Sequence, residues 1–160
     1  TLGCLLGYEH VLKGGVPSKV LDVGTGSGVL AIAAIKTGAE RAIGTEIDVQ
    51  SVAVANENAR KNNVSDAFKT YQTRGATNRI IQSAAPYDLI FANILARPLT
   101  RLAPNLVPLI GPGGHIILSG LLTRQEPLVR AAYTGRGLAL VKRIRKDGWS
   151  TLVLRRVVSA

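Results

Sequence analysis

The sequence has 160 residues and a mass of 16.9 kDa, a size that suits a single domain with a hydrophobic core of its own. Hydrophobic residues make up 46% and charged residues 19%, which excludes a disordered polar chain, and no apolar run is long enough to cross a membrane. Twenty basic residues against ten acidic ones give a formal net charge of +10, which favours an acidic or polyanionic partner.

Short β-branched apolar runs alternate along the chain with segments whose apolar residues recur at helical spacing. In chain order the prediction is a linker-like segment 1–10, strand 19–23, helix 29–36, strand 41–46, helix 49–63, strand 67–72, a loop 73–86 with at least one helical turn, strand 87–92, helix 98–109, strand 115–119, helix 123–134, and strands 138–144 and 151–157. This alternation indicates right-handed βαβ units, and therefore a mostly parallel sheet with helices on both faces.

Four local signals add expectations for the C-terminal half. Pro104 should kink or divide its helix, and the glycines and proline of residues 111–114 should turn the chain into the next strand. Thr123, with Glu126 three residues later, has the spacing of a capping box. Residues 146–148 should join the last two strands as a hairpin, which adds an antiparallel strand to the sheet.

A glycine-rich loop, Gly24-Thr25-Gly26-Ser27-Gly28, follows the first predicted strand and opens a helix. Glycines there let the backbone turn sharply and approach a ligand closely. The chain carries Val29 where a dinucleotide fingerprint needs a small residue, so a pyrophosphate ligand is disfavoured. Asp22, just before the loop, would repel a diphosphate but could accept a hydrogen bond from an ammonium group. The loop therefore predicts a ligand that carries positive charge.

An acidic residue, Glu46, ends the second predicted strand. At this place its carboxylate can accept hydrogen bonds from both hydroxyls of a ribose, and Ile47 can cover one face of a purine. An adenosine with a cationic amino-acid tail is S-adenosylmethionine, which is therefore the predicted cofactor. The alternative is a tight turn whose glycines serve packing, beside a solvated acid at a strand end.

Asn93 follows the fourth predicted strand. Because the carboxyl ends of parallel strands line the ligand crevice, Asn93 should face the same site as Gly24 and Glu46. Its amide oxygen can accept from a substrate N–H and aim the nitrogen lone pair at a sulfonium methyl group, which predicts a catalytic role by positioning. The alternative role is that of a helix N-cap.

The remaining candidate functional residues give weaker indications of a catalytic or binding role. Neither histidine has partners at metal-ligand spacing, so no metal site is predicted. The single cysteine, Cys4, allows no internal disulfide, which is typical of a cytoplasmic protein, and Trp149 is expected to pack rather than bind. Residues 121–160 hold nine basic and two acidic residues, and their basic run 142–146, beside Arg155 and Arg156, could contact RNA phosphates.

Four segments together resemble one known family: VLDVGTGSG (20–28), IGTEID (43–48), FANILARPL (91–99) and PGGHIILSGLL (112–122). They are similar to the catalytic domain of the PrmA family, bacterial methyltransferases that trimethylate amino groups of the eleventh protein of the large ribosomal subunit. The resemblance covers nearly the whole chain. The glycine loop is shared by most class I methyltransferases, whereas the last two segments are much more specific.

The resemblance implies that residues 1–160 form a Rossmann-like class I methyltransferase domain with a seven-stranded sheet and S-adenosylmethionine as its cofactor. The loop, the acid and the resemblance together give an expected cofactor-binding set of Asp22, Gly24, Thr25, Gly26, Gly28, Glu46, Ile47 and Asn93. Asn93, the expected catalytic residue, would lie between the cofactor and the substrate nitrogen.

The chain departs from the family pattern in three ways. The family usually has Asp where this chain has Glu46, which is one methylene longer. No Asp occurs between Thr73 and Pro86, where many class I enzymes place one against the adenine amino group. The family's Thr/Gly/His-rich segment before Thr1 and its N-terminal substrate-recognition domain are absent from this sequence, so we expect a fragment that binds cofactor weakly and methylates poorly.

The predicted function is methyl transfer from S-adenosylmethionine to lysine or N-terminal amines of a large-subunit ribosomal protein in the cytoplasm, with no membrane partner and with an RNA contact through the basic C-terminal part. One alternative is a methyltransferase for ribosomal RNA or a small amine, although an RNA enzyme more typically has a base-stacking aromatic residue where this chain has Ile94. The other alternative is a non-enzymatic RNA-binding module on the same fold.

Overall fold

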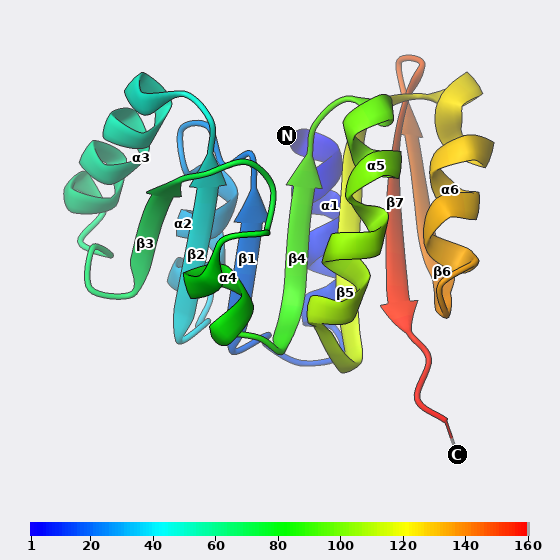
Figure 1. The fold of residues 1–160 in the computed structure, drawn as a ribbon, viewed down its shortest axis with the longest axis horizontal. Coiled ribbons are helices and arrows are strands. Elements are labelled where there is room, and N and C mark those ends of the chain that lie inside the picture. Colours follow the sequence, from blue (N-terminus) through cyan, green and yellow to red (C-terminus); the bar gives the residue numbers. More distant parts are fainter. Residues whose placement is uncertain (160) are drawn as a thin grey trace.

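A seven-stranded sheet runs through the middle of the computed structural model, which describes residues 1–159 (Figure 1). The strands are β1 (Lys19–Val23), β2 (Arg41–Glu46), β3 (Phe68–Gln72), β4 (Tyr87–Asn93), β5 (Ile110–Leu122), β6 (Leu138–Lys146) and β7 (Trp149–Arg156), in the spatial order β3-β2-β1-β4-β5-β7-β6. Neighbours from β3 to β5 pair in parallel, whereas β7 runs antiparallel to both β5 and β6. The predicted fold class is therefore confirmed.

Helices cover both faces of the sheet, as predicted (Figure 1). They are α1 (Leu2–Leu12), α2 (Val29–Lys36), α3 (Val49–Lys61), α4 (Arg79–Ser83), α5 (Ala96–Leu106) and α6 (Glu126–Thr134). Because successive strand residues point to opposite faces, Leu89 and Phe91 of β4 join the core beneath α1 to α3, while Ile90 and Ala92 join the core beneath α4 to α6. The order of the strands reverses between β1 and β4, and a ligand crevice is expected at that point.

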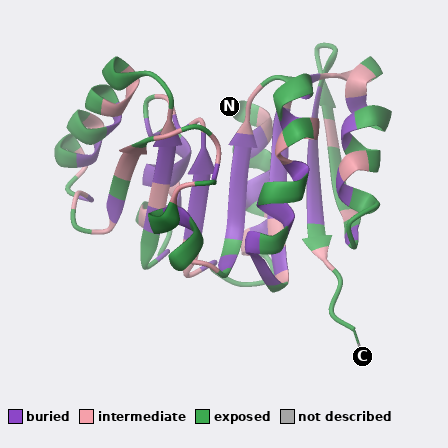
Figure 2. Ribbon diagram, viewed as in Figure 1, coloured by how far each residue is buried: buried purple, intermediate pink, exposed green. Residues whose placement is uncertain are grey.

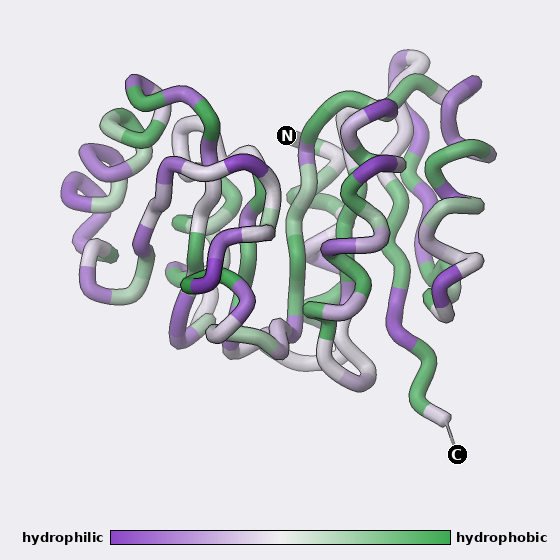
Figure 3. Tube along the Cα trace, viewed as in Figure 1, coloured by the Kyte–Doolittle hydropathy of each residue, from purple (hydrophilic) through white to green (hydrophobic). Residues whose placement is uncertain are grey.

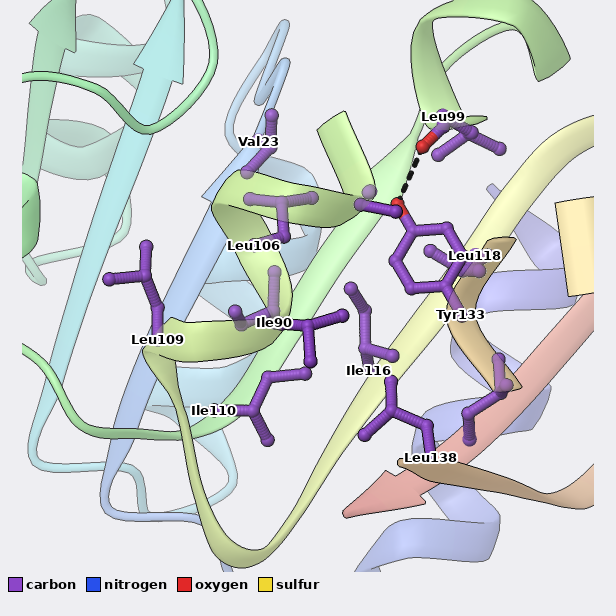
Figure 4. Packing of buried hydrophobic residues seen from close by; sticks show 14 of the residues in the cluster. Val23, Ile90, Leu99, Leu106, Leu109, Ile110, Ile116, Leu118, Tyr133 and Leu138 are labelled. Atoms are coloured by element: carbon purple, nitrogen blue, oxygen red, sulfur yellow. Dashed lines mark hydrogen bonds between the residues drawn. The ribbon is translucent and has the colours of Figure 1, made fainter. Parts of the chain in front are cut away.

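Both cores lie between the sheet and its helices. Figure 2 shows that the central strands β1, β4 and β5 are largely buried, and Figure 3 shows apolar residues along β4 in the centre and polar ones along α3 at the edge. Figure 4 shows the core beneath α5 and α6, where the Tyr133 hydroxyl donates a 2.8 Å hydrogen bond to the carbonyl oxygen of Leu99. Within residues 1–159 no helix combines the length and the apolar character that a membrane crossing needs.

The expectation of a linker over residues 1–10 is wrong, because these residues form most of helix α1. Cys4, Tyr8 and Val11 recur at helical spacing and are buried, and the rings of Tyr8 and Phe91 meet edge to face with their centroids 5.5 Å apart. The glycines of this segment lower its intrinsic helix propensity, so its sequence pattern is weak. The helix is stabilised by close packing on the sheet, which needs a glycine at position 7, because a Cβ at Gly7 would lie only 3.0 Å from the Val153 side chain.

The expected capping box of Thr123 and Glu126 is also wrong. A 3₁₀ turn occupies Thr123–Gln125, and α6 begins at Glu126. The Thr123 hydroxyl donates to the carbonyl oxygen of Gly148 (3.1 Å), and the Glu126 carboxylate accepts from the Ser150 hydroxyl (2.8 Å). Both side chains bond to the hairpin of β6 and β7, whereas in a capping box each would accept from the backbone N–H of the other residue.

Three further predictions for the C-terminal half have different outcomes. Residues 111–114 were expected as a turn before strand 115–119, but they lie within β5 as an irregularity, where its pairing with β4 shifts. Pro104 does not divide α5, which continues to Leu106 and then tightens into the 3₁₀ turn Val107–Leu109. The hairpin turn is confirmed: Asp147 and Gly148 have φ values of 51° and 79°, as a type I′ turn requires.

Candidate functional site

Two cavities open beside the tip of β4. The Glu46 pocket, of about 500 Å³, is lined by Val23, Gly24, Thr45, Glu46, Ile47, Thr73, Arg74, Gly75, Ile94, Leu95, Pro98, Arg101 and Leu102. The Asn93 pocket, of about 510 Å³, is lined by Thr1, Leu2, Gly3, Leu6, Asn93, Ser119, Gly120, Ile144, Lys146, Asp147, Trp149 and Thr151. Asn93 and Ile94 are neighbours in the chain, yet they line different pockets. The tip of β4 therefore separates the two cavities.

The glycine loop combines close packing with one open position. Gly24, Gly26 and Gly28 have φ values of 69°, 56° and 83°, a region that favours glycine. A Cβ at Gly24 would lie 2.7 Å from the Ile94 side chain, and one at Gly28 would lie 2.8 Å from the Phe68 ring, but one at Gly26 would meet nothing within 4 Å. Gly24 and Gly28 thus allow the loop to pack, whereas Gly26 leaves bare backbone beside open space that a ligand can use.

Asp22 and Thr25 support this loop from within. Asp22 is 1% exposed, and its carboxylate accepts a 2.7 Å hydrogen bond from the Thr25 hydroxyl. The Thr25 backbone N–H donates in turn to the carbonyl oxygen of Thr45 on β2 (2.9 Å). Neither Asp22 nor Thr25 lines the Glu46 pocket, so their direct contact with a cofactor stays a prediction, while their contacts hold the loop against β2.

Burial raises the pKa of Asp22 to about 7, and this makes stability depend on pH. A carboxyl whose pKa is higher in the folded than in the unfolded chain stabilises the fold fully below the unfolded value, and this contribution is lost as pH rises through the folded value. We therefore expect the free energy of unfolding to decrease between about pH 5 and about pH 8 in the wild type more than in Asp22→Asn. Urea unfolding of both proteins at the two pH values measures this, and identical pH dependence would contradict the assignment.

Glu46 is held in place by backbone N–H groups. Its Oε2 accepts from Gly26 (3.0 Å), and its Oε1 accepts from Ile47 (2.9 Å) and from Asp48 (3.4 Å). Two carboxylate oxygens offer about four acceptor sites, so the carboxylate keeps acceptor capacity toward the pocket. Ile47, 57% exposed, lines the same pocket. An oriented carboxylate beside an exposed aliphatic side chain is the pair of surfaces that a ribose and an attached base need.

Asn93 has an amide that is available to a ligand. Within residues 1–159 its side chain makes no hydrogen bond, and the N-cap of α5 is Leu95, so the N-cap alternative for Asn93 is excluded. The Asn93 pocket has a polar floor, where the hydroxyls of Ser119 and Thr151 are hydrogen-bonded at 2.8 Å. The pocket thus presents one amide above two hydroxyls, an arrangement that can receive a polar group such as an amine.

Several pocket residues were missed from the sequence. Thr73, Arg74 and Gly75 of the loop after β3 line the Glu46 pocket, in the segment where no adenine-binding acid occurs. Trp149 was expected to pack, but it is 51% exposed and lines the Asn93 pocket. No motif marks these positions. The available signal for Trp149 was its place beside a hairpin turn, where a large aromatic residue has few neighbours to pack against.

Four arginines of the basic C-terminal part are paired or hydrogen-bonded to other groups of the chain. The guanidinium groups of Arg143 and Arg145 pair with Glu126, at 2.5 and 3.0 Å. Arg155 donates to the carbonyl oxygen of Gly113, and Arg156 donates to that of Ile110. Clusters of three or more side chains suited to a metal ion do not occur in the described part of the chain.

The order of the strands, the single reversed strand β7 and the glycine loop, of which Gly24 lines the Glu46 pocket, define a class I methyltransferase fold. An RNA methyltransferase from Salinibacter ruber, solved with S-adenosyl-L-homocysteine, has this fold, with a TM-score of 0.70 at 20% identity over 98% of this chain and 93% of that chain. Residues 1–157 match the family described as ribosomal protein L11 methyltransferase (PrmA). The chain belongs to that family, as the resemblance implied.

Relatives in this family are similar over nearly the whole chain. The ribosomal protein L11 methyltransferase of Caulobacter sp. (strain K31) is 49% identical over 156 residues, which are 98% of this chain and 54% of the relative. The crystal structure of the ribosomal protein L11 methylase from Lactobacillus delbrueckii subsp. bulgaricus superposes with a TM-score of 0.87 at 34% identity, covering 96% of this chain and 76% of that one. The chain spans about half the length of the curated relatives that it matches.

Proposed function

We propose that this chain is the catalytic domain of a methyltransferase that transfers methyl groups from S-adenosylmethionine to amino groups of ribosomal protein L11. The observation that carries the proposal is the pair of pockets around the tip of β4, with a carboxylate in one and a free amide in the other. The names of the relatives supply the substrate. Because that substrate is a ribosomal protein, we infer that the enzyme acts in the cytoplasm.

The Glu46 pocket would hold the adenosine part of the cofactor. Glu46 would accept from the ribose hydroxyls, Ile47 would cover one face of the base, and the open backbone at Gly26 would leave room for the methionine end. When bound, S-adenosylmethionine supplies an electrophilic methyl group on a sulfonium. Hydrogen bonds to Asp22, Thr45 and Glu46 hold the loop in place, so little ordering would be required on binding, which favours affinity.

Asn93 would orient the acceptor amine. Its amide oxygen can accept one N–H of a neutral amine, so that the nitrogen lone pair points across the tip of β4. The nitrogen of the neutral amine would form the new bond to the methyl carbon as the bond between that carbon and the sulfonium sulfur breaks, and S-adenosylhomocysteine would be the leaving group. The methylated amine would then lose a proton to solvent. Because the amine would react in its neutral form, its proton must be lost before transfer, and Asn93 would contribute by positioning rather than by proton transfer.

The test of this proposal uses a protein that contains this chain and is as long as its curated relatives. This protein is called the full-length enzyme. We expect mass spectrometry to show methyl groups on lysine or N-terminal amines of L11 after incubation with S-adenosylmethionine. Methylation of ribosomal RNA but not of L11 would favour the alternative substrate class. RNA binding that responds to neither S-adenosylmethionine nor its product would favour a non-enzymatic module.

The RNA contact of the basic C-terminal part is a narrower proposal. Lys142 and Lys146 are exposed, and among residues 1–159 no acidic side chain pairs with them. These two lysines, rather than the arginines of the run, are therefore available to phosphates. If they contact RNA, the double variant Lys142→Gln/Lys146→Gln should reduce the salt dependence of RNA binding by about one unit of log–log slope for each lost contact. An unchanged slope would show that these two lysines do not contact RNA phosphates.

A further inference from the structure

Glu126 is a buried acid that lies outside both pockets. It is 2% exposed at the start of α6, and both of its carboxylate oxygens have partners. The Ser150 hydroxyl donates to Oε2 at 2.8 Å, and the Arg145 Nε donates to the same oxygen at 3.0 Å. The Arg143 Nε lies 2.5 Å from Oε1. These four residues are called the Glu126 cluster.

The Glu126 cluster joins α6 to both strands of the last hairpin. Arg143 and Arg145 belong to β6, Ser150 belongs to β7, and Arg145 stands directly opposite Ser150 in the ladder. The turn begins at the next position on each strand. A second attachment holds the turn itself, because the Thr123 backbone N–H donates to the carbonyl oxygen of Gly148 at 2.9 Å.

The turn that is fixed in this way forms one wall of the Asn93 pocket. Lys146, Asp147 and Trp149 line the pocket on this side, and Leu2 and Leu6 of α1 line it too. The hairpin lies at the end of the sheet, since β6 pairs only with β7 (Figure 1). β6 is the edge strand, whereas β7 is also paired with β5, where Leu121 lies opposite Ser150 and Leu122 opposite Trp149. The position of this wall therefore depends on the pairing of β7 with β5 and on the contacts that hold the hairpin to α6.

We propose that Glu126 is a positioning residue, which fixes the turn of β6 and β7 so that Trp149 forms the outer wall of the acceptor-amine pocket. The inference rests on the proposed function, because it assigns the Asn93 pocket to the acceptor. It gives the basic run a role inside the protein: two of its arginines hold the carboxylate that anchors the hairpin. It also explains why the aromatic side chain of Trp149 is half exposed beside Asn93.

The charge of Glu126 is essential to this role. Burial opposes its ionisation, but the hydrogen bonds from Arg145 and Ser150 and the nearby Arg143 outweigh burial and lower the pKa of Glu126 below its usual value. The carboxylate is therefore ionised at neutral pH. Removing its charge leaves two guanidinium groups side by side without their counter-ion, so the strands should separate from α6 at this point.

The test compares Glu126→Gln with Glu57→Gln, a matched control that breaks the exposed ion pair with Lys61 on α3. Trp149 is the only tryptophan of the 160 residues, so its fluorescence reports on the turn alone. In the 160-residue chain we expect Glu126→Gln to lower the fluorescence anisotropy of Trp149 and to increase its quenching by acrylamide. In the full-length enzyme we expect the KM for L11 to rise roughly tenfold with a smaller change in kcat. Affinity and stoichiometry for S-adenosylhomocysteine should stay unchanged, and Glu57→Gln should match the wild type.

Two results would overturn the inference. In the first, Glu126→Gln changes neither the fluorescence of Trp149 nor the KM for L11. In the second, the stoichiometry of S-adenosylhomocysteine binding to Glu126→Gln falls in proportion to kcat, which indicates only a smaller fraction of folded protein. If Glu126→Gln does not fold, Arg145→Gln, whose side chain is 52% exposed, tests the same prediction. An inactive wild type would refute the proposed function, while the Trp149 measurements would still decide whether Glu126 positions the turn.

Discussion

Replacing Glu46 by alanine should lower the affinity for S-adenosylmethionine and S-adenosylhomocysteine by a hundredfold or more. A hydrogen bond from a ribose hydroxyl to a carboxylate contributes roughly 1.5–3 kcal/mol, and about 1.4 kcal/mol corresponds to a factor of ten. The substitution also removes the acceptor for the N–H of Gly26, at 3.0 Å, and so loosens the loop on which the cofactor would lie. Isothermal titration calorimetry with S-adenosylhomocysteine measures the change.

Two further variants make this result specific. Glu46→Asp keeps the carboxylate, and it has the acid that the family usually carries at this place, so it should retain most of the affinity. Glu40→Ala removes an exposed acid of the same charge outside both pockets and should bind as the wild type does. If Glu46→Ala binds S-adenosylhomocysteine as tightly as Glu40→Ala does, the ribose assignment is incorrect.

Replacing Asn93 by alanine should lower kcat for methylation of L11 on the order of a hundredfold in the full-length enzyme, because the amine loses the acceptor that orients its lone pair. Cofactor affinity should be largely retained, since Asn93 lines the pocket on the other side of the β4 tip from Glu46. Steady-state methylation rates, with S-adenosylhomocysteine binding measured in parallel, separate the two effects.

Matched controls exist for this variant too. Asn93→Asp keeps an acceptor oxygen and should retain more turnover than Asn93→Ala. Asn105→Ala removes an exposed amide from α5 outside both pockets and should have no effect. Turnover in Asn93→Ala that equals turnover in Asn105→Ala would discard the catalytic role of Asn93.

The sequence predicts the centre of the sheet well, because local pattern and tertiary packing agree there. The strand that ends at Asn93 is a largely buried apolar run, and the strand that ends at Glu46 buries Ala42, Gly44 and Thr45. The glycine loop follows a strand and precedes a helix, as its sequence pattern predicts. The ends of β2 and β4 were therefore placed correctly, and their side chains do line neighbouring pockets. Which of them contacts the cofactor stays a prediction.

The parts of the fold and the site that the sequence did not predict depend on tertiary contacts that no local pattern encodes. Helix α1 contains glycines that weaken a helical signal, and it forms because Cys4 and Tyr8 fill a groove on the sheet. Glu126 has the spacing of a capping residue, but its partners Arg145 and Ser150 lie on strands far along the chain. The wall that Trp149 forms depends on that cluster, so the sequence by itself could not assign Trp149 to a pocket.

We expect the cofactor to lie across the tips of β1, β2 and β4, with its adenosine on Glu46 and its reacting end toward Asn93. A crystal structure of the chain with S-adenosylhomocysteine tests this most directly. In that crystal structure we expect a ribose hydroxyl within hydrogen-bond distance of the Glu46 carboxylate, the base against Ile47, and the ligand sulfur facing the Asn93 pocket. A ligand bound outside the Glu46 pocket, or one whose sulfur points away from Asn93, would contradict it.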